Sequence, residues 1–183
     1  MIYLILLIMF GIISLFVDKS FSSFMFSIRS GFLSSFVYYT LLILKEYILL
    51  IFSVIILYFK DKKKIINAVI GFFLTGFVVT ILKYFINRPR PFEVILNSKL
   101  NIFDYSFASF NTSFPSWHTA AAFSLLPFVF YFNKKLGYLW IAISILIGFA
   151  RIYTGFHYLS DVLFGGLIGY LIGYLSLKKF NYF

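Results

Sequence analysis

The stretch ARIYTGFHYLSD, residues 150–161, joins two long apolar runs and carries three ionisable side chains. His157 and Asp161 are four residues apart, so on a helix they would share one face and form a hydrogen bond. A carboxylate at that position selects the tautomer of the imidazole and raises its basicity. Arg151 precedes a threonine-glycine turn, so its planar guanidinium can fold back over the same place and hold a phosphate. The stretch predicts either a reactive histidine site or a helix junction with interfacial charges.

The composition around this stretch is that of an integral membrane protein. Of the 183 residues, 62% are hydrophobic and only 12% are charged, and the mean hydropathy is +0.97. A soluble domain of this size needs more polar residues to cover its surface. The chain has no cysteine, which excludes disulfides and cysteine-based metal sites.

Apolar runs along the chain predict an all-α, polytopic membrane protein with six transmembrane helices. The predicted spans cover residues 1–17, 44–59, 65–86, 116–132, 136–153 and 157–177. Two short segments, 21–28 and 32–44, precede the second span or overlap its start and are predicted to be interfacial helices. The second segment has thirteen residues and is too short for a ~30 Å hydrocarbon core at about 1.5 Å per residue.

We expect one membrane-embedded domain over residues 1–183. Its core covers residues 44–177, while residues 1–43 supply the first span and the interfacial helices. Gly165, Gly169 and Gly173 recur at every fourth position of the last span. Glycines at this spacing let two helices approach closely, so this face is predicted to pack against another span.

Basic residues predict the orientation of the chain. The formal net charge is +10, and eight of the sixteen basic residues form three clusters between apolar runs, at 60–64, 134–135 and 178–179. The positive-inside rule places these clusters and both termini in the cytoplasm. The loop at 87–114 and the turn at 154–156 then face the periplasm or the exterior of a cell inner (cytoplasmic) membrane. Because the cations cluster between spans, we expect no nucleic-acid partner.

Three helix ends bring ionisable residues to this outer level. Lys83 and Arg90 lie at the end of one predicted span, and His118 lies at the start of the next. Together with residues 150–161 they form a cationic site, where helix N-termini add backbone N–H donors. A phosphoryl group fits such a site: cations bind its oxygens, one histidine attacks, and the other protonates the departing oxygen.

A zinc site is the rival chemical interpretation of the same residues. His118, His157 and Asp161 provide three possible ligands, but the surrounding cations oppose a bound cation. We therefore expect neither a metal nor a cofactor. Arg88 lies near the cationic residues and is given a lower expectation of direct contact.

Three motifs resemble the signature of the type-2 phosphatidic acid phosphatase superfamily, which includes membrane lipid phosphatases and soluble vanadium haloperoxidases. They occur in the family's order and with its internal spacing. The matching residues are Lys83, Arg90 and Pro91 for K-x6-R-P, Pro115, Ser116 and His118 for P-S-G-H, and Arg151, His157 and Asp161 for S-R-x5-H-x3-D. Two positions depart from the pattern.

Trp117 occupies a position where the family has glycine, and Ala150 replaces a serine. The tryptophan keeps its backbone N–H donor but adds a large ring, which leaves the shape and specificity of the pocket open. The ring is either an interfacial anchor or a contact for the lipid.

The resemblance implies that His157 is the nucleophile and forms a phosphohistidine intermediate, which water then hydrolyses. Asp161 would orient His157, while His118 would protonate the leaving group and later activate the water. The implied ligands of the phosphoryl oxygens are Lys83, Arg90, Arg151, Ser116 and the backbone N–H of Trp117. The implied reaction needs no metal.

We therefore expect an integral membrane enzyme that hydrolyses the phosphomonoester or pyrophosphate headgroup of a lipid. The candidate substrates are polyprenyl diphosphate, phosphatidylglycerophosphate, phosphatidic acid and the lipid A 1-phosphate, and the sequence does not choose among them. A non-enzymatic anion or lipid transporter with the same cationic site is the alternative, and haloperoxidase chemistry is a third. The sequence makes no prediction of oligomeric state.

Overall fold

The computed structural model describes residues 2–95 and 112–179, and the side chains of residues 9–95 and 112–178. All regular structure in these residues is helical. The helices are α1 (Ile2–Ser27), α2 (Gly31–Ile43), α3 (Glu46–Lys60), α4 (Lys63–Ile86), α5 (Pro91–Ile95), α6 (Trp117–Phe132), α7 (Lys134–Tyr153) and α8 (Leu159–Lys179). The predicted all-α class is confirmed for this part of the chain. Residues 96–111 of the predicted outer loop lie outside it.

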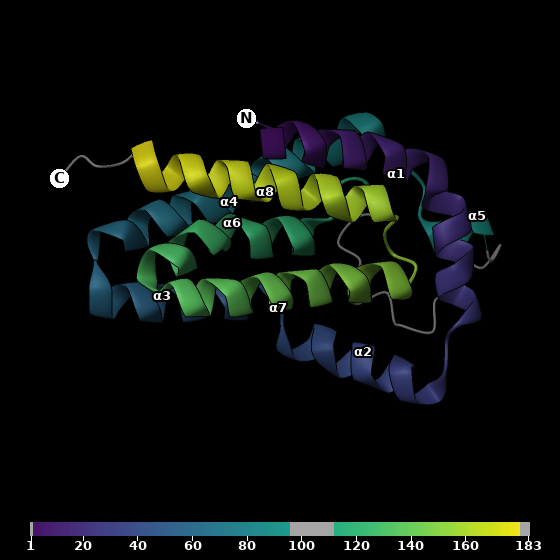
Figure 1. The fold of residues 1–183 in the computed structure, drawn as a ribbon, viewed down its shortest axis with the longest axis horizontal. Coiled ribbons are helices and arrows are strands. Elements are labelled where there is room, and N and C mark those ends of the chain that lie inside the picture. The colour runs from purple at the N-terminus through teal and green to yellow at the C-terminus, as the bar shows by residue number, and fades with distance from the viewer. Residues whose placement is uncertain (1, 96–111, 180–183) are drawn as a thin grey trace.

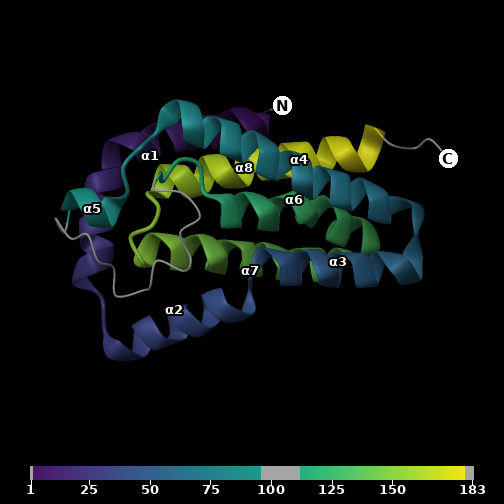
Figure 2. The same cartoon turned by 180° about the vertical axis from the view of Figure 1, so that it is seen from behind.

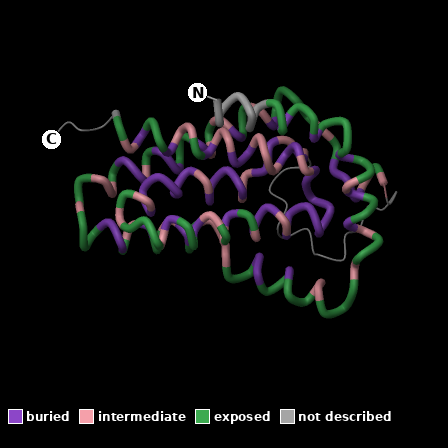
Figure 3. Tube along the Cα trace, in the orientation of Figure 1, coloured by how far each residue is buried: buried purple, intermediate pink, exposed green. Residues whose placement is uncertain are grey.

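Helix α6 forms the centre of the bundle and packs against α3, α4, α7 and α8 (Figures 1 and 2). Residues 119–122 and 124–129 of α6 are buried, and Figure 3 shows this central tube as mostly purple. Alanines at 120–122 keep the start of α6 narrow, so neighbouring helices can approach it. The central helix thus carries its N-terminus, with its motif residues, into the interior of the protein.

The glycines of α8 explain how closely it approaches α6. A Cβ atom added to Gly169 would lie 2.0 Å from the carbonyl oxygen of Ala120, and one added to Gly173 would lie 1.9 Å from that of Ser124. At Gly165 the added atom would lie 2.6 Å from the carbonyl oxygen of Ser116. No larger residue fits at these positions. The predicted helix-packing role of the glycines is therefore confirmed.

Fewer helices qualify as membrane spans by length and composition than the predicted six. Four helical stretches are long and apolar enough to cross a membrane: Met9–Ser27, Lys63–Ile95, Lys134–Tyr153 and Leu159–Lys178. The pair α2 and α3, bent by 52°, gives a possible fifth. Helix α6 has 16 residues and reaches only about 24 Å along its axis, less than the ~30 Å hydrocarbon core. Six spans are therefore not confirmed, because the predicted spans at 44–59 and 116–132 form helices of only 15 and 16 residues.

The first 44 residues also differ in detail. Residues 2–27 form one continuous helix, whereas the sequence predicted a first span followed by a separate helix at 21–28. Figures 1 and 2 show that α1 changes direction, so that its C-terminal part crosses the end of the bundle near α5. Helix α2 is separate, and the Ser30 hydroxyl caps it by accepting a hydrogen bond from the Leu33 N–H at 3.3 Å. An interfacial position for these segments stays a prediction.

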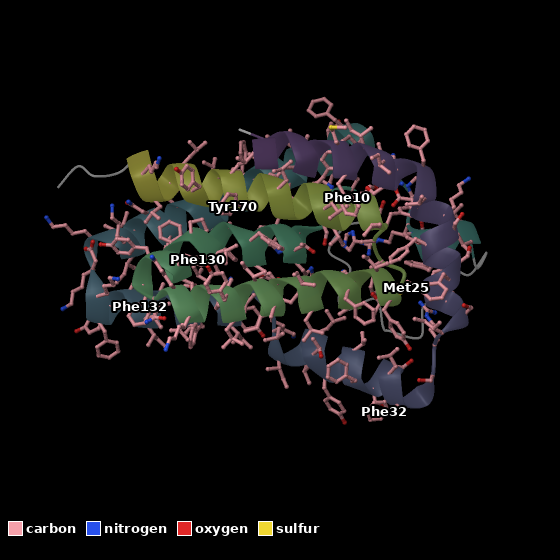
Figure 4. The ribbon with its side chains drawn as sticks, in the orientation of Figure 1. Phe10, Met25, Phe32, Phe130, Phe132 and Tyr170 are labelled. Atoms are coloured by element: carbon pink, nitrogen blue, oxygen red, sulfur yellow. The ribbon has the colours of Figure 1, made fainter. Side chains whose placement is uncertain are left out.

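The outside of the bundle is apolar, as a bilayer requires. Exposed aromatic residues are found on several helices, among them Phe10 of α1, 54% exposed, and Phe32 of α2, 85% exposed (Figure 4). With the apolar spans, these surfaces identify a multi-pass membrane protein.

The predicted lysine clusters meet at one end of the bundle. The Nζ of Lys60 donates to the carbonyl oxygens of Tyr131 and Phe132 at 2.5 and 2.8 Å, and that of Lys64 donates to Leu177 at 3.3 Å. The three sequence motifs lie toward the other ends of α4, α6, α7 and α8. Among the described residues, every buried acidic, basic or histidine side chain belongs to that second end. Which end faces the cytoplasm stays a prediction.

Candidate active site

A tight turn between α7 and α8 positions His157. Helix α7 ends at Tyr153, and Gly155 follows with φ of +79°, a conformation that side chains other than glycine rarely adopt. A Cβ atom there would also lie 2.7 Å from the ring of Phe26. Helix α8 begins only at Leu159. His157 therefore lies in the connection, and the prediction that it starts the last helix is wrong.

His157 is held by a backbone carbonyl instead of the expected carboxylate. Its Nδ1 lies 2.6 Å from the carbonyl oxygen of Ser113 and 3.8 Å from Oδ2 of Asp161. A carbonyl oxygen only accepts hydrogen bonds, so Nδ1 carries the proton in the neutral imidazole. Its Nε2 then keeps a lone pair, as a nucleophile needs.

The environment keeps this imidazole uncharged. His157 is only 2% exposed. Burial lowers the pKa of His157 well below its usual value near 6.5, and the positive charges of Arg151, Lys83 and Arg90 lower it further. His118 also contributes to this lowering of the pKa, which places the second imidazole within electrostatic reach. The structure therefore gathers residues of all three motifs around one neutral histidine.

Ser113 had no signal in the sequence, yet the segment around it connects two motifs. Its N–H donates to the carbonyl oxygen of Arg88 at 2.8 Å, and its hydroxyl donates to that of Pro89 at 3.1 Å. The Nζ of Lys83 donates to the carbonyl oxygen of Thr112 at 2.8 Å. Residues 112–113 thus link the C-terminal end of α4 to the connection between α7 and α8 that carries His157.

Arg88 is the main partner of Asp161, a role that the sequence did not predict for it. Its Nη1 donates to Oδ1 of Asp161 at 2.7 Å, and its Nη2 donates to Oδ2 of Asp18 at 2.8 Å. The other oxygen of Asp161 accepts from the N–H of Tyr158 at 2.7 Å. Asp18 also accepts from the N–H of Ser160 at 3.0 Å. This network joins α1, the end of α4 and the start of α8.

Two buried guanidinium groups face the same aromatic ring. Arg90 and Arg151, 3% and 1% exposed, lie over Phe156 at 5.0 and 4.7 Å from its centroid. The Nε and Nη1 of Arg151 are buried without a hydrogen-bond partner among the described residues. Buried donors of this kind are costly unless a ligand satisfies them. An anion bound here would supply both the acceptors and the missing negative charge.

The second motif begins α6 and contributes a second histidine. Ser116 is the N-cap residue, its N–H donates to the carbonyl oxygen of Asp161 at 3.0 Å, and its hydroxyl bonds Thr119 at 3.0 Å. The first N–H groups of α6 have no partner within the helix, so the positive end of its dipole points to the site.

A carboxylate from α3 lies beside the histidine of this motif. Oε2 of Glu46 lies 3.4 Å from Nε2 of His118 and has no hydrogen-bond partner within the part of the chain that the structure describes. Glu46 lies at the start of α3 and more than seventy residues before the histidine, so sequence reasoning had only the charge to notice and did not connect the two.

The zinc alternative requires three ligands around one point. Among residues 2–95 and 112–179, no group of three histidine, aspartate or glutamate side chains could hold a metal ion. Asp161 is bonded to Arg88, and Nδ1 of His157 is bonded to a carbonyl oxygen. The alternative set of His118, His157 and Asp161 does not form such a group among the described residues.

Comparison with known proteins agrees with the motifs. A model of the PAP2 superfamily matches residues 64–183. The chain is 33% identical over 112 residues to the bacitracin transport permease protein BcrC of Bacillus licheniformis, covering 61% of this chain and 53% of that protein. It is 29% identical over 109 residues to the undecaprenyl-diphosphatase BcrC of Bacillus subtilis, covering 57% and 54%. The chain thus spans about half the length of these relatives.

A solved structure shares the fold over nearly the whole chain. The crystal structure of Aquifex aeolicus LpxE aligns with a TM-score of 0.74 and 29% identity, covering 88% of this chain and 95% of that chain. The similarity therefore extends beyond the motifs to the arrangement of the helices.

Proposed function

This chain belongs to the PAP2 superfamily of membrane lipid phosphatases, and from that premise we propose that it hydrolyses the phosphate or diphosphate headgroup of a membrane lipid through a phosphohistidine at His157. Polyprenyl diphosphate is the first candidate substrate, because a matched relative is named undecaprenyl-diphosphatase. The observation that carries the proposal is the pairing of two kinds of group: buried Arg151 donors that lack a partner among the described residues, and a neutral histidine whose proton lies on Nδ1, so that Nε2 carries the lone pair.

Substrate binding would complete the hydrogen bonding of the site. The guanidinium groups of Arg90 and Arg151, held against Phe156, would bind the phosphoryl oxygens. Lys83 would add a third positive charge, and Ser116 and the backbone N–H of Trp117 would add donors at the start of α6.

Phosphoryl transfer would proceed in two balanced steps. First, Nε2 of His157 attacks phosphorus, the bond between phosphorus and the leaving oxygen breaks, and His118 donates a proton to that oxygen. The lipid product leaves as an alcohol or a monophosphate. Next, water attacks phosphorus, His118 takes a proton from it, and the P–N bond breaks to release phosphate and neutral His157.

The orientation of His157 would depend on Ser113 more directly than on Asp161. The carbonyl of Ser113 holds the Nδ1 proton at 2.6 Å, while Asp161 lies 3.8 Å away. Asp161 would stabilise the positive imidazole that forms when His157 is phosphorylated, and its bond to Arg88 at 2.7 Å would hold it there. Both residues thus support the nucleophile from the side opposite Nε2.

Glu46 would support the acid. Its carboxylate lies 3.4 Å from Nε2 of His118, so it would stabilise the protonated form that must give a proton to the leaving group. Without a carboxylate, the nearby cations would oppose that protonation. Glu46 is therefore proposed as a positioning residue for the reaction.

Transport through the same site has less support. A transport path needs polar groups along the length of the bundle. Among the described residues, the buried acidic, basic and histidine side chains all lie at the site end, and the lysine end buries none. We therefore favour hydrolysis, with an active site that faces the periplasm or exterior if the lysine clusters are cytoplasmic.

Phosphate release from a panel of lipids tests the proposal. Purified protein is incubated with polyprenyl diphosphate, phosphatidylglycerophosphate, phosphatidic acid and the lipid A 1-phosphate, with and without excess chelator. We expect release that survives chelation and disappears in His157→Ala. The control is Lys62→Ala, which changes an exposed cation in the lysine cluster. Normal release by His157→Ala would falsify the proposed nucleophile, while anion flux without hydrolysis would favour a transporter.

A further inference from the structure

A pocket of about 280 Å³ begins at Lys83 and follows α4 away from the catalytic end. Its α4 lining includes Phe72, Gly76 and Phe77, all N-terminal to the lysine, and Trp117 of α6 forms the facing wall. Phe72 precedes Lys83 by eleven residues, which is about 16 Å along a helix. The pocket therefore extends along α4 from the level of the cationic site toward the middle of the bundle.

The pocket opens on the outside of the bundle. Phe73 and Phe77 of its lining are 65% and 64% exposed, and the outer surface of these helices faces lipid. A molecule can therefore enter sideways from the bilayer, with its charged end at Lys83 and its apolar part against the aromatic rings. No water-filled path is needed for this entry.

Trp117 gives the pocket its shape. Its ring makes an edge-to-face contact with Phe72, with centroids 5.2 Å apart. It also lies against Gly76, where an added Cβ atom would be 3.2 Å from the indole. The family has glycine at the Trp117 position, so a large aromatic wall replaces an open space there. Gly76 is the small residue that makes room for this wall.

The size of the pocket suits one chain segment. Ligand pockets for whole small molecules have volumes of about 300–1,000 Å³, so 280 Å³ is too small for a complete lipid. At about 30 Å³ per water-sized group, it holds roughly nine such groups, close to two isoprene units. One charged end and apolar walls match the phosphate-proximal part of a single-chain lipid.

We propose that this pocket, lined by Phe72, Gly76, Phe77 and Trp117 below Lys83, binds the first two isoprene units of a polyprenyl diphosphate. The proposal rests on the function proposed above, because it requires the diphosphate to occupy the cationic site. It identifies Trp117 as a specificity-determining residue and makes α4 and α6 the side from which the substrate enters. The remaining isoprene units would lie in the bilayer.

A chain-length series tests this proposal. The headgroup is kept constant in isopentenyl, geranyl, farnesyl and undecaprenyl diphosphates, and kcat/KM for phosphate release is measured in detergent. We expect about a tenfold or larger increase from five to ten carbons, because the second unit is buried against aromatic rings, and little increase beyond ten carbons. An increase that continues in proportion to chain length would overturn the proposal, since it would reflect partition into micelles.

Variants of α4 locate the effect. Gly76→Leu fills the pocket and should remove the gain between isopentenyl and geranyl diphosphate, and Phe77→Ala should reduce it. Phe85→Ala is the matched control, because Phe85 is on the same helix, is 77% exposed and does not line the pocket. Thermal unfolding of each variant shows whether it folds. If Gly76→Leu fails to fold, the comparison of Phe77→Ala with Phe85→Ala decides the question.

A larger apolar pocket of about 410 Å³ is the competing position for the chain. It is lined by residues of α1, α6, α7 and α8, including Phe123 and Leu163, and contains none of the motif residues. If Leu163→Phe removes the chain-length gain and Gly76→Leu does not, the proposed pocket is wrong. If no prenyl diphosphate of any length is hydrolysed, the proposed function and the proposed pocket both fail.

Discussion

Replacement of Arg88 by methionine is expected to destabilise the site end of the protein. Arg88 connects Asp18 of α1 with Asp161 of α8, through bonds of 2.8 and 2.7 Å. These carboxylates are 1% and 0% exposed, and the arginine side chain is 23% exposed. Methionine keeps the length and apolar stem of the side chain but removes the charge, so two buried carboxylates lose their shared partner.

The expected loss follows from that burial. Removal of one partner from a buried ion pair costs about 3–5 kcal/mol, because the remaining charge stays buried. Asp18 keeps two donors from Ser160, and Asp161 keeps the N–H of Tyr158. Arg88 is also partly exposed. We therefore expect a loss near the lower end, about 3 kcal/mol in the free energy of unfolding.

Denaturant unfolding in mixed micelles, followed by circular dichroism, measures this change. Lys62→Met is the matched control, because it removes one positive charge at an exposed position and should shift stability by less than about 0.5 kcal/mol. Asp18→Asn combined with Arg88→Met should be less destabilising than the sum of the single changes. Wild-type stability in Arg88→Met would show that the network contributes nothing to the free energy of unfolding. Full additivity of Asp18→Asn and Arg88→Met would show the same for the bond between the two side chains.

Three further changes test other parts of the structure. Gly169→Ala should destabilise the protein by about 1–3 kcal/mol through overpacking, as measured by thermal unfolding. Gly31→Ala is the control and should not destabilise it, because nothing lies within 4 Å of the added atom. Equal effects of the two changes would refute the close α6–α8 contact. Glu46→Gln should lower kcat by about tenfold to 100-fold and shift the basic limb of the pH profile to lower pH. The reason is that His118 loses the negative charge that favours its protonated form. An unchanged pH profile would show that Glu46 has no part in the mechanism. His157 should stay neutral at pH 6, because burial and nearby cations lower its pKa well below 6.5. The chain has two histidines, so a His118→Gln variant leaves the imidazole NMR signal of His157 resolved. That signal should not titrate near pH 6.5, and a midpoint at or above that pH would contradict the buried site.

Short-range sequence patterns predicted the parts of the fold that depend on spacing. The four-residue repeat of Gly165, Gly169 and Gly173 predicted a close helix contact, and the carbonyl oxygens of α6 occupy the space that side chains would need. The motifs likewise predicted which cations and histidines gather at one end. The glycine repeat was accessible because it depends on residues of one segment and on the regular period of a helix. The gathering of the motifs was accessible because the predicted order of the helices brings three helix ends to one level.

The partner of His157 was not accessible in this way. The spacing to Asp161 assumed a helix through both residues, but the turn at Gly155 delays α8 until Leu159. The nearest acceptor is then the carbonyl of Ser113, 44 positions earlier in the chain. A backbone acceptor carries no side-chain signature, so no residue type marks it in the sequence.

Long-range carboxylates were missed for a related reason. Asp18 and Glu46 each stand beside a lysine in the sequence, and their partners Arg88 and His118 lie about seventy residues farther along the chain. Only the packing of α1 and α3 onto the bundle brings them to the site. The six predicted spans are also not confirmed, because two of the apolar runs form helices of 15 and 16 residues, shorter than a ~30 Å hydrocarbon core requires.

The most direct test of the account is detection of the covalent intermediate. Protein is mixed with polyprenyl diphosphate carrying a labelled terminal phosphate, quenched within milliseconds under alkaline conditions, and analysed by peptide mass spectrometry. The account predicts an acid-labile phosphate on His157, increased in His118→Ala when a substrate with an activated leaving group is used, because hydrolysis then lacks its base. Substrate turnover with no phosphate on His157, or with phosphate on another residue, would contradict it.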